Sequence, residues 1–273
     1  LSGFIKGERI GAFALTEPDA GSDIASLKMK ARHHESGDYV LHGTKTYISN
    51  AGLASQYIVF ANVNPRKKAK GITAFIVEPS DPGVKVEPFE VMAPHPIGTV
   101  TFWQTRIPPS RRLGEEGEGF KIAMNTLNTY RLSVAGAAIG MARRALDEAI
   151  KHATTRHQFG KPLMKQQQIA ASLADAATEL DASRLLVYRA AYMRDVFDSD
   201  NTKEVAMAKL YATEAAQRIV DRCLQVHGGS GVKRGSPLER LYREVRALRI
   251  YEGASEVQRV IIAKQLERSI EEL

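Results

Sequence analysis

Residues Leu15–Asp23 read LTEPDAGSD and follow directly on a strand-like run. The segment concentrates turn formers, hydroxyl groups and carboxylates. Pro, Asp, Gly and Ser each favour turns, through a fixed φ, side-chain bonds to the backbone or freedom at positive φ. Two interpretations are open. The segment is either an Asx-rich structural turn or a loop whose backbone amides and hydroxyls bind a flat polar ligand.

Strand-like patterns continue around this loop through the first 112 residues. Alternating or continuous apolar runs predict strands at residues 38–43, 45–49, 56–61, 72–77 and 99–103. Gly43-Thr44 is the expected turn between the first two. Five prolines between residues 79 and 96 exclude a helix there. Residues 1–112 are therefore expected to form a small antiparallel, barrel-like β-domain.

The period changes to that of helices from Gly114 onward. Apolar residues recur every three or four positions between Ile169 and Leu180, and again between Val205 and Val226. Asn201 followed by Glu204 predicts a helix start in which both side chains cap the first turn. Gly228–Gly231 ends that helix, and a last one runs from Ser255 towards Leu273. An α+β protein follows, with an up-and-down four-helix bundle over residues 113–273.

Composition and charge are those of a soluble globular protein. The 273 residues are 44% hydrophobic and 25% charged, with a net charge of +7 that suits either an anionic partner or a basic surface. One cysteine permits no internal disulfide, which favours a reducing compartment. No apolar run is long enough to span a membrane. The chain starts at Leu1 rather than Met, so it is expected to be a fragment, a processed product or a sequence missing its start. No basic-then-apolar leader opens it, and the expected location is the cytoplasm, or the mitochondrial matrix of a eukaryote.

Several common sites are excluded by the motifs that are missing. No glycine-rich nucleotide fingerprint or P-loop occurs. The histidines show no helical metal pairing, and one cysteine cannot build a thiolate zinc site, so no metal is expected. The arginines of residues 240–249 alternate with glutamates, which indicates a salt-bridged helix face rather than a nucleic-acid surface.

Two further segments combine charged and aromatic residues at expected helix ends. Arg156–Lys161 (RHQFGK) offers a cation for phosphate beside an aromatic ring, or else a helix cap at Gly160. Tyr251–Glu256 (YEGASE) places a carboxylate between a tyrosine and a glycine before a helix. It is either a site or a capping turn.

Five segments in one order carry a resemblance to a known family. They are Leu15–Asp23, Tyr47–Asn50, Arg156–Gly160, Gln225–Gly229 and Tyr251–Gly253, and together they resemble acyl-CoA dehydrogenases. The likeness covers essentially the whole chain. It implies the family's middle β-domain and C-terminal helical domain, without the leading helical domain.

The resemblance also implies FAD as cofactor, bound by residues from both halves. The residues that would line the flavin ring and its ribityl chain, or lie behind the ring, are Phe13, Leu15, Thr16, Gly21, Ser22, Tyr47, Ile48 and Ser49. The diphosphate and adenosine of a neighbouring subunit's FAD correspond to Arg156, His157, Gln158, Phe159, Gln167, Gln225, Gly228 and Gly229. Ala254 and Glu256 lie in a cofactor-facing turn. A site shared between subunits implies a homodimer or homotetramer.

The implied reaction is α,β-dehydrogenation of an acyl-CoA thioester. Glu252 matches the family's base and would remove the α-proton, while the β-hydrogen leaves as hydride to flavin N5. Some branches carry the base elsewhere, where this chain has Tyr130, which cannot serve. Residues expected near the substrate are Ser22, Asn128, Arg131, Tyr251 and Gly253. An electron-transfer flavoprotein or similar acceptor would take the electrons.

Other functions on the same scaffold stay open at this point. An acyl-CoA oxidase or related flavin oxidase would use the same fold, although a glutamate at position 252 favours the dehydrogenase. A non-catalytic, truncated subunit is the interpretation from a different class, suggested by the absent leading domain.

Overall fold

The computed structural model describes residues 2–197 and 201–271, which sort into two compact units, Leu1–Thr126 and Leu127–Leu273. The sequence pattern places the boundary between residues 112 and 113. The units instead divide inside α2 (Gly119–Thr155), because the first turns of that long helix pack with the sheet: a Cβ added at Gly119 would lie 2.7 Å from the Thr73 backbone.

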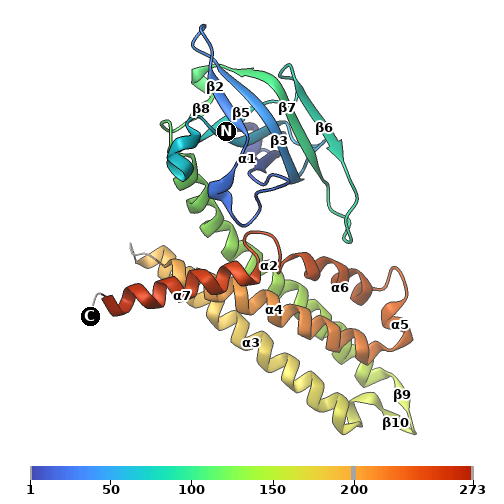
Figure 1. Ribbon diagram of the computed structural model, residues 1–273. Coiled ribbons are helices and arrows are strands. Elements are labelled where there is room, and N and C mark those ends of the chain that lie inside the picture. The colour runs from blue at the N-terminus through green and yellow to red at the C-terminus, as the bar shows by residue number, and fades with distance from the viewer. Residues whose placement is uncertain (1, 198–200, 272–273) are drawn as a thin grey trace. The chain divides into compact units, whose positions relative to one another are not determined.

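The first unit is a mixed but mostly antiparallel sheet (Figure 1). A short helix, α1 (Ser2–Ile5), precedes it. Its strands are β1 (Gly11–Ala14), β2 (Lys30–His33), β3 (Tyr39–Ser49), β4 (Gln56–Asn62), β5 (Ile72–Val77), β6 (Val84–Pro88), β7 (Ile97–Ile107) and β8 (Arg112–Leu113). They run in the order β6-β7-β3-β2-β4-β5-β8, with β1 paired to β4. The pairs β1–β4 and β2–β4 are parallel.

The core of this unit comes from the alternating and continuous apolar strands that the sequence singles out. Leu41, Tyr57, Val59, Phe75 and Phe102 are fully buried in it. Burying side chains of this size contributes roughly 1.5–3 kcal/mol each. The sheet is thus stabilised by the residues whose pattern predicted it.

One strand differs from the expectation. The predicted turn at Gly43-Thr44 is wrong, because β3 runs without a break from Tyr39 to Ser49. Gly43 has a φ of +149°, and a Cβ at this position would lie 2.8 Å from Cγ of Met29. The glycine therefore serves close approach of two strands rather than a change of chain direction.

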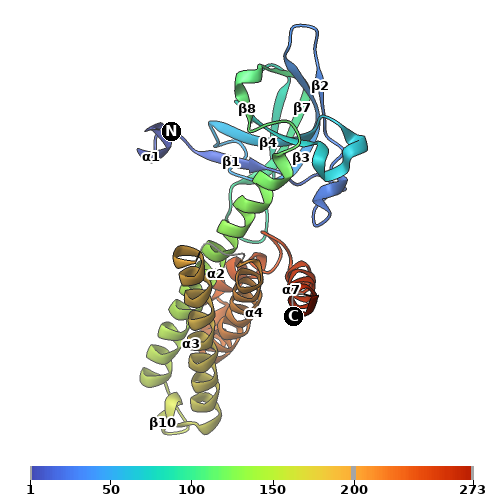
Figure 2. The same cartoon turned by 90° about the vertical axis from the view of Figure 1, so that its left-hand side faces the viewer.

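The second unit is helical. It holds most of α2, then α3 (Gln167–Val196), α4 (Thr202–His227), α5 (Gly229–Val232), α6 (Pro237–Ala247) and α7 (Ser255–Glu271). Figures 1 and 2 show α2, α3 and α4 side by side. The expected four helices are α2, α3, α4 and α7, and α6 is an additional one. The α+β class, with a β-domain followed by a helical domain, is confirmed.

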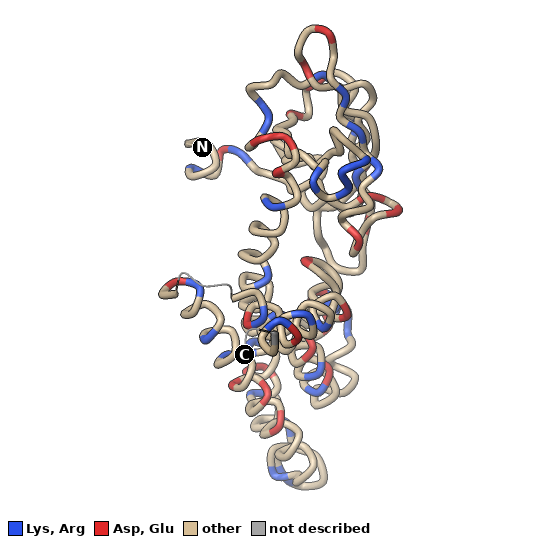
Figure 3. The backbone as a smooth tube through the Cα atoms, turned by 60° about the vertical axis from the view of Figure 1, so that its left-hand side comes forward, with Lys and Arg blue, Asp and Glu red and all other residues tan. Residues whose placement is uncertain are grey.

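Small side chains dominate the core between these helices. Buried alanines alternate with a few larger residues, among them Leu173, Val187, Ile219 and Val245. Alanine has the highest helix propensity and allows close packing. Most of residues 240–249 belong to α6, which ends at Ala247 and carries ion pairs at four-residue spacing, Arg240–Glu244 and Glu239–Arg243. Figure 3 shows basic and acidic positions mixed along the chain.

The start of α4 is only partly as expected. Asn201 occupies the N-cap position, but its side chain makes no capping hydrogen bond, and its Nδ2 is buried without a partner among the described residues. Glu204 does not reach back either. Its carboxylate lies 3.5 Å from Arg189 and 3.7 Å from Lys203, and this pairing competes with the capping interaction.

Candidate active site

Glu252 lies in the turn between α6 and α7 and has a left-handed backbone, with a φ of +55°. A side chain in this region adds strain on the order of 1–3 kcal/mol, which persists only where the surroundings fix the conformation. The next residue, Gly253, has a φ of +93°, and a Cβ there would lie 2.5 Å from Nε2 of Gln258. This backbone conformation and the closeness of Gln258 therefore favour glycine at position 253.

Three side chains from three helices hold this turn by its carbonyl oxygens. Arg131 of α2 donates from Nε to the Glu252 carbonyl at 3.1 Å. Lys209 of α4 donates from Nζ to the Gly253 carbonyl at 2.8 Å, and Gln258 of α7 donates to the same oxygen at 2.9 Å. Their convergence stabilises the strained conformation and leaves the Glu252 carboxylate out of these bonds.

The electrostatics of the turn favour a basic carboxylate. Burial raises the pKa of Glu252, and the positive charges of Arg131 and Lys209 oppose this shift. Burial lowers the pKa of Lys209 to about 8 and raises that of the neighbouring Tyr251 to about 12. Desolvation disfavours every charged form, so the glutamate becomes a stronger base than it would be in water.

A second set of contacts fixes the start of α7. Ser255 donates from Oγ to Glu214 at 2.6 Å, and Arg249 contacts the same carboxylate oxygen at 2.9 Å. Burial alone would raise the pKa of Glu214, but the hydrogen bonds from Ser255 and Arg249 lower it overall. The carboxylate stays charged and joins α4 to the turn.

Among the other residues expected near the substrate, Asn128 and Arg131 are brought together. Arg131 is buried and donates from Nη1 to Oδ1 of Asn128 at 3.3 Å. Ala254 is half-buried in the same turn, and Glu256 is exposed on the first turn of α7.

Lys209 and Gln258 escaped the sequence reasoning. The apolar stripe of α4 contains Ala208 and Ala212, and a lysine beside that stripe is the signal that could have found Lys209. No such signal marks Gln258.

In the β-domain, Glu17 organises the loop Leu15–Asp23. Its carboxylate accepts hydrogen bonds from Lys45 Nζ at 2.9 Å and from the backbone N–H groups of Lys28 and Met29 at 2.7 and 3.0 Å. Lys45 is fully buried, also donates to the Leu15 carbonyl, and has its pKa lowered by burial to about 8. The base of the loop is thus fixed internally, while Gly21 and Ser22 at its tip are exposed.

The other residues expected to line the flavin differ in their exposure: some are packed inside the β-domain and others lie at its surface. Leu15 is buried and Thr16 half-buried, with the Thr16 carbonyl accepting from the Thr46 N–H. Phe13 packs against Phe60 with ring centroids 5.0 Å apart. Ile48 belongs to the sheet core.

Tyr47 and Ser49, on either side of Ile48, face outward. Tyr47 has a φ of +56° and its ring meets Phe89 edge-on at 5.4 Å. Ser49 Oγ lies 2.8 Å from Nε2 of His95. The end of β3 therefore presents an aromatic ring and a hydroxyl at the surface.

The segment Arg156–Lys161 lies largely in a β-hairpin, formed by β9 (His157–Gln158) and β10 (Lys161–Pro162). α2 ends at Thr155, and Gln158 pairs with Lys161 across a two-residue turn whose residues, Phe159 and Gly160, both have positive φ. Such a turn is type I′, so the alternative of a helix cap at Gly160 is wrong. Phe159 is 91% exposed at the tip. An aromatic ring presented in this way is unusual for a structural turn.

Four more of the expected residues lie at helix ends. Gln167 is the first residue of α3, and Gln225 is exposed in the last turn of α4. Gly228, with a φ of +56°, ends α4, and Gly229 starts α5.

The donor set fits a flavin dinucleotide. The side chains of Arg156 and Gln158 form no hydrogen bond or ion pair within the described ranges 2–197 and 201–271, and His157 is exposed. An unpaired guanidinium beside exposed amide and imidazole groups suits a diphosphate.

Within those same ranges, no helix is long and apolar enough to cross a membrane.

The two-domain fold and this set of groups define a flavoprotein-type oxidoreductase scaffold. Comparison with known families assigns it further. The family model for the acyl-CoA dehydrogenase middle domain matches residues 12–104, and that for the C-terminal domain matches residues 117–267. The chain belongs to the acyl-CoA dehydrogenase family. It is an oxidoreductase acting on acyl-CoA, and FAD is the cofactor of the family.

Individual relatives match almost the whole chain. Acryloyl-CoA reductase (NADH) of Anaerotignum propionicum is 44% identical over 265 residues, which cover 96% of this chain and 67% of that protein. The mitochondrial short-chain specific acyl-CoA dehydrogenase of Rattus norvegicus is 45% identical over 273 residues, covering 98% and 66%. The chain thus spans about two thirds of the length of these relatives.

Solved structures agree with this assignment. Butyryl-CoA dehydrogenase from Megasphaera elsdenii superposes with a TM-score of 0.93 at 38% identity, covering 97% of this chain and 70% of that one. A chain from a study of the electron transferring flavoprotein of Acidaminococcus fermentans superposes with a TM-score of 0.94 at 36% identity, with the same coverage.

Proposed function

We propose that this chain catalyses FAD-dependent α,β-dehydrogenation of an acyl-CoA thioester, with Glu252 as the base that removes the α-proton. The observation that carries the proposal is the clamped, strained turn in which burial raises the pKa of the Glu252 carboxyl. A free glutamate titrates near about 4.3 and is a poor base for a carbon acid. Desolvation at this turn increases its basicity.

The same turn supplies a donor for the developing negative charge. The backbone N–H of Glu252 has no acceptor among the described residues, although its own carbonyl is bound by Arg131. Directed at the thioester oxygen, this N–H would stabilise the enolate-like charge as the proton leaves. A single such donor contributes about 2.7–4 kcal/mol in other acyl-transfer sites.

FAD, when bound, supplies the redox chemistry by accepting the β-hydrogen as hydride. The residues that would hold its ring are those of the loop Leu15–Asp23 and the end of β3, with Tyr47 and Ser49 exposed. The diphosphate of the FAD in a neighbouring subunit would be bound by Arg156, His157 and Gln158, at the exposed hairpin. The proposal therefore includes a homodimer or homotetramer, in the cytoplasm or the mitochondrial matrix, that passes electrons to an electron-transfer flavoprotein or similar acceptor.

The reverse reaction, reduction of an enoyl-CoA, is a second candidate. Three similar proteins are named as reductases or as a subunit of one. The raised pKa of Glu252 also makes its protonated form more available than that of an ordinary glutamate. Protonated Glu252 would return the proton to the α-carbon, and FAD, if bound in its reduced form, would supply the hydride for the β-carbon. The initial rate of dehydrogenation is measured with an oxidised dye that accepts electrons, and that of reduction with a reduced dye that donates them. The two rates decide which direction the enzyme favours.

The test of the proposal replaces Glu252 with glutamine. Glu252→Gln should keep FAD bound and slow the anaerobic bleaching of the flavin by acyl-CoA by about 10²–10⁴-fold or more, because a positioned general base contributes that much. Stopped-flow absorbance at the flavin band measures it. Glu267→Gln, at an exposed glutamate on α7, is the matched control. Bleaching of Glu252→Gln at the wild-type rate would remove this residue from the mechanism.

A further inference from the structure

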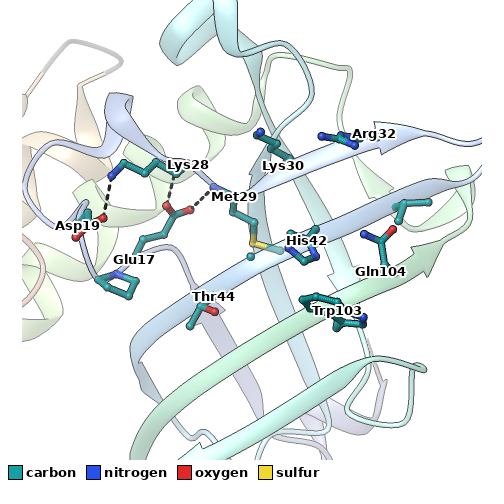
Figure 4. Close-up of a pocket in the computed structure, with 13 residues that line it drawn as sticks. Glu17, Asp19, Lys28, Met29, Lys30, Arg32, His42, Thr44, Trp103 and Gln104 are labelled. Carbon is teal, nitrogen blue, oxygen red and sulfur yellow. Dashed lines mark hydrogen bonds and ion pairs between the residues drawn. The ribbon is translucent and has the colours of Figure 1, made fainter.

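A hollow of about 630 Å³ lies on the sheet of the first unit, away from the turn of Glu252 in the sequence and built only from residues 17–104. Figure 4 shows its side chains rising from β2, β3 and β7, with the loop of Glu17 and Asp19 at one end. A volume of this size is within the range of small-molecule sites, about 300–1,000 Å³.

A β-bulge creates the aromatic side of this hollow. Leu41 pairs with Thr105 and Gly43 with Phe102, so His42 alone opposes the two residues Trp103 and Gln104. Gln104 is in the left-handed region, with a φ of +52°. Bulges re-aim side chains and are frequent beside functional sites.

The bulge leaves a tryptophan outside the core. Trp103 is 67% exposed, and its ring meets that of His42 at 4.8 Å with an angle of 63° between the planes. Nδ1 of His42 is buried and has no hydrogen-bond partner within the described part of the chain. An exposed indole ring therefore lies on this side of the hollow.

The opposite side of the hollow is cationic. Lys30 and Arg32 are two residues apart on β2 and so share one face of the sheet, where Lys30 pairs with His42 and Arg32 with Val40. Both are exposed, and neither forms an ion pair or a side-chain hydrogen bond with another described residue.

The acidic groups at the rim are already neutralised. Glu17 accepts from Lys45 and two backbone N–H groups, and Asp19 pairs with Lys28 at 2.8 Å. The charges of Lys30 and Arg32 therefore remain uncompensated. The hollow combines surplus positive charge with an exposed aromatic face.

We propose that this hollow binds a small ligand that joins phosphate to a flat aromatic ring, such as a nucleoside diphosphate. Lys30 and Arg32 bind the phosphates, and the ring stacks on Trp103. The proposal does not rest on Glu252, although Glu17 and Asp19 at one end of the hollow belong to the loop Leu15–Asp23 that would also line the flavin.

The experiment uses FAD-loaded protein, in which the cofactor's own nucleotide positions are filled, and follows the fluorescence of Trp103, the only tryptophan of the chain. ADP, adenosine and inorganic phosphate are titrated separately. We expect a saturable change with ADP at lower concentration than with either part alone. The double variant Lys30→Gln/Arg32→Gln should weaken ADP binding by about tenfold or more, since hydrogen bonds from charged groups contribute at least about that much.

Two further variants make the result decisive. Trp103→Ala removes the fluorophore, so ADP binding to this variant is measured by equilibrium dialysis with radiolabelled ADP. We expect this binding to be weaker than that of the wild type. Lys85→Gln, at an exposed lysine of β6 that pairs with Glu87, should bind ADP as the wild type does. The absence of saturable binding, or ADP affinity that Lys30→Gln/Arg32→Gln and Trp103→Ala leave unchanged, would overturn the proposal. Equal weakening by Lys85→Gln would also overturn it.

Discussion

Glu252 is held by its main chain rather than by its carboxylate. The carbonyl oxygens of residues 252 and 253 accept hydrogen bonds from Arg131, Lys209 and Gln258. No ion pair within 4.0 Å joins the Glu252 carboxylate to another described residue, and the two cations act on it only through their field. The arrangement fixes the position of a base without neutralising it, which general-base chemistry requires.

The pH dependence of catalysis should report this field. Lys209 lowers the pKa of Glu252, so Lys209→Met should raise it, and the rise of kcat/KM with pH should move to higher pH. The variant also loses the bond to the Gly253 carbonyl. The pH profiles of kcat/KM for both enzymes provide the measurement.

The matched control for this change is Lys264→Met, at an exposed lysine of α7. Its pH profile should superpose on that of the wild type. An acid limb that stays in place in Lys209→Met would show that Lys209 has no electrostatic influence on the base, even if the activity falls.

At the scale of elements, the loop Leu15–Asp23 shows how a short segment is fixed by a single carboxylate. Glu17 neutralises a fully buried lysine and satisfies two backbone N–H groups at once. Turn composition leaves open both an Asx-rich structural turn and a ligand-binding loop. Nothing in the pattern indicates that the loop's anchor, Lys45, lies within a strand, 28 residues from Glu17. The base of the loop is thus fixed by internal bonds, while Gly21 and Ser22 at its tip are exposed.

The two acids of this loop should therefore differ in their effect on stability. Glu17→Gln leaves the Lys45 ammonium buried without a counter-charge, and we expect the free energy of unfolding to fall by about 3 kcal/mol or more. Asp19→Asn removes a pair whose side chains are about 70% exposed, and it should change the free energy little.

Urea denaturation followed by circular dichroism compares the two variants with the wild type. Similar midpoints for Glu17→Gln and Asp19→Asn would contradict the assignment of Glu17 as the anchor of the loop.

For the whole molecule, the described chain is two compact units with separate cores, one rich in aromatic and β-branched residues and the other rich in alanine. Cys223, the only cysteine of the sequence, is fully buried in the second core, and burial raises its pKa to about 12. A thiol in this state is protonated and inaccessible, and so unreactive.

This cysteine makes thiol labelling a reporter of the helical unit. Native protein at pH 8 should react with a disulfide reagent on the order of 10³-fold more slowly than the urea-unfolded chain, since reaction requires opening of that core. The absorbance of the released thiolate measures the rate. Fast labelling of the native protein would show that the helical core opens readily.

The sequence by itself determined the class of fold, the order of its two halves and the segments that carry the candidate site. This follows because strand alternation, helical periodicity and turn chemistry are local properties of the chain. Five short segments sufficed to indicate the family, since each keeps its own residue types in order.

Only the tertiary structure decided which side chains meet. The pairing of Glu17 with Lys45, the convergence of Arg131, Lys209 and Gln258 on one turn, and the unbroken strand through Gly43 all depend on contacts between residues distant in the chain. Such contacts leave no periodic trace in a single sequence. Burial, which sets the basicity of Glu252 and the inertness of Cys223, is likewise a property of the packed chain and not of the residue.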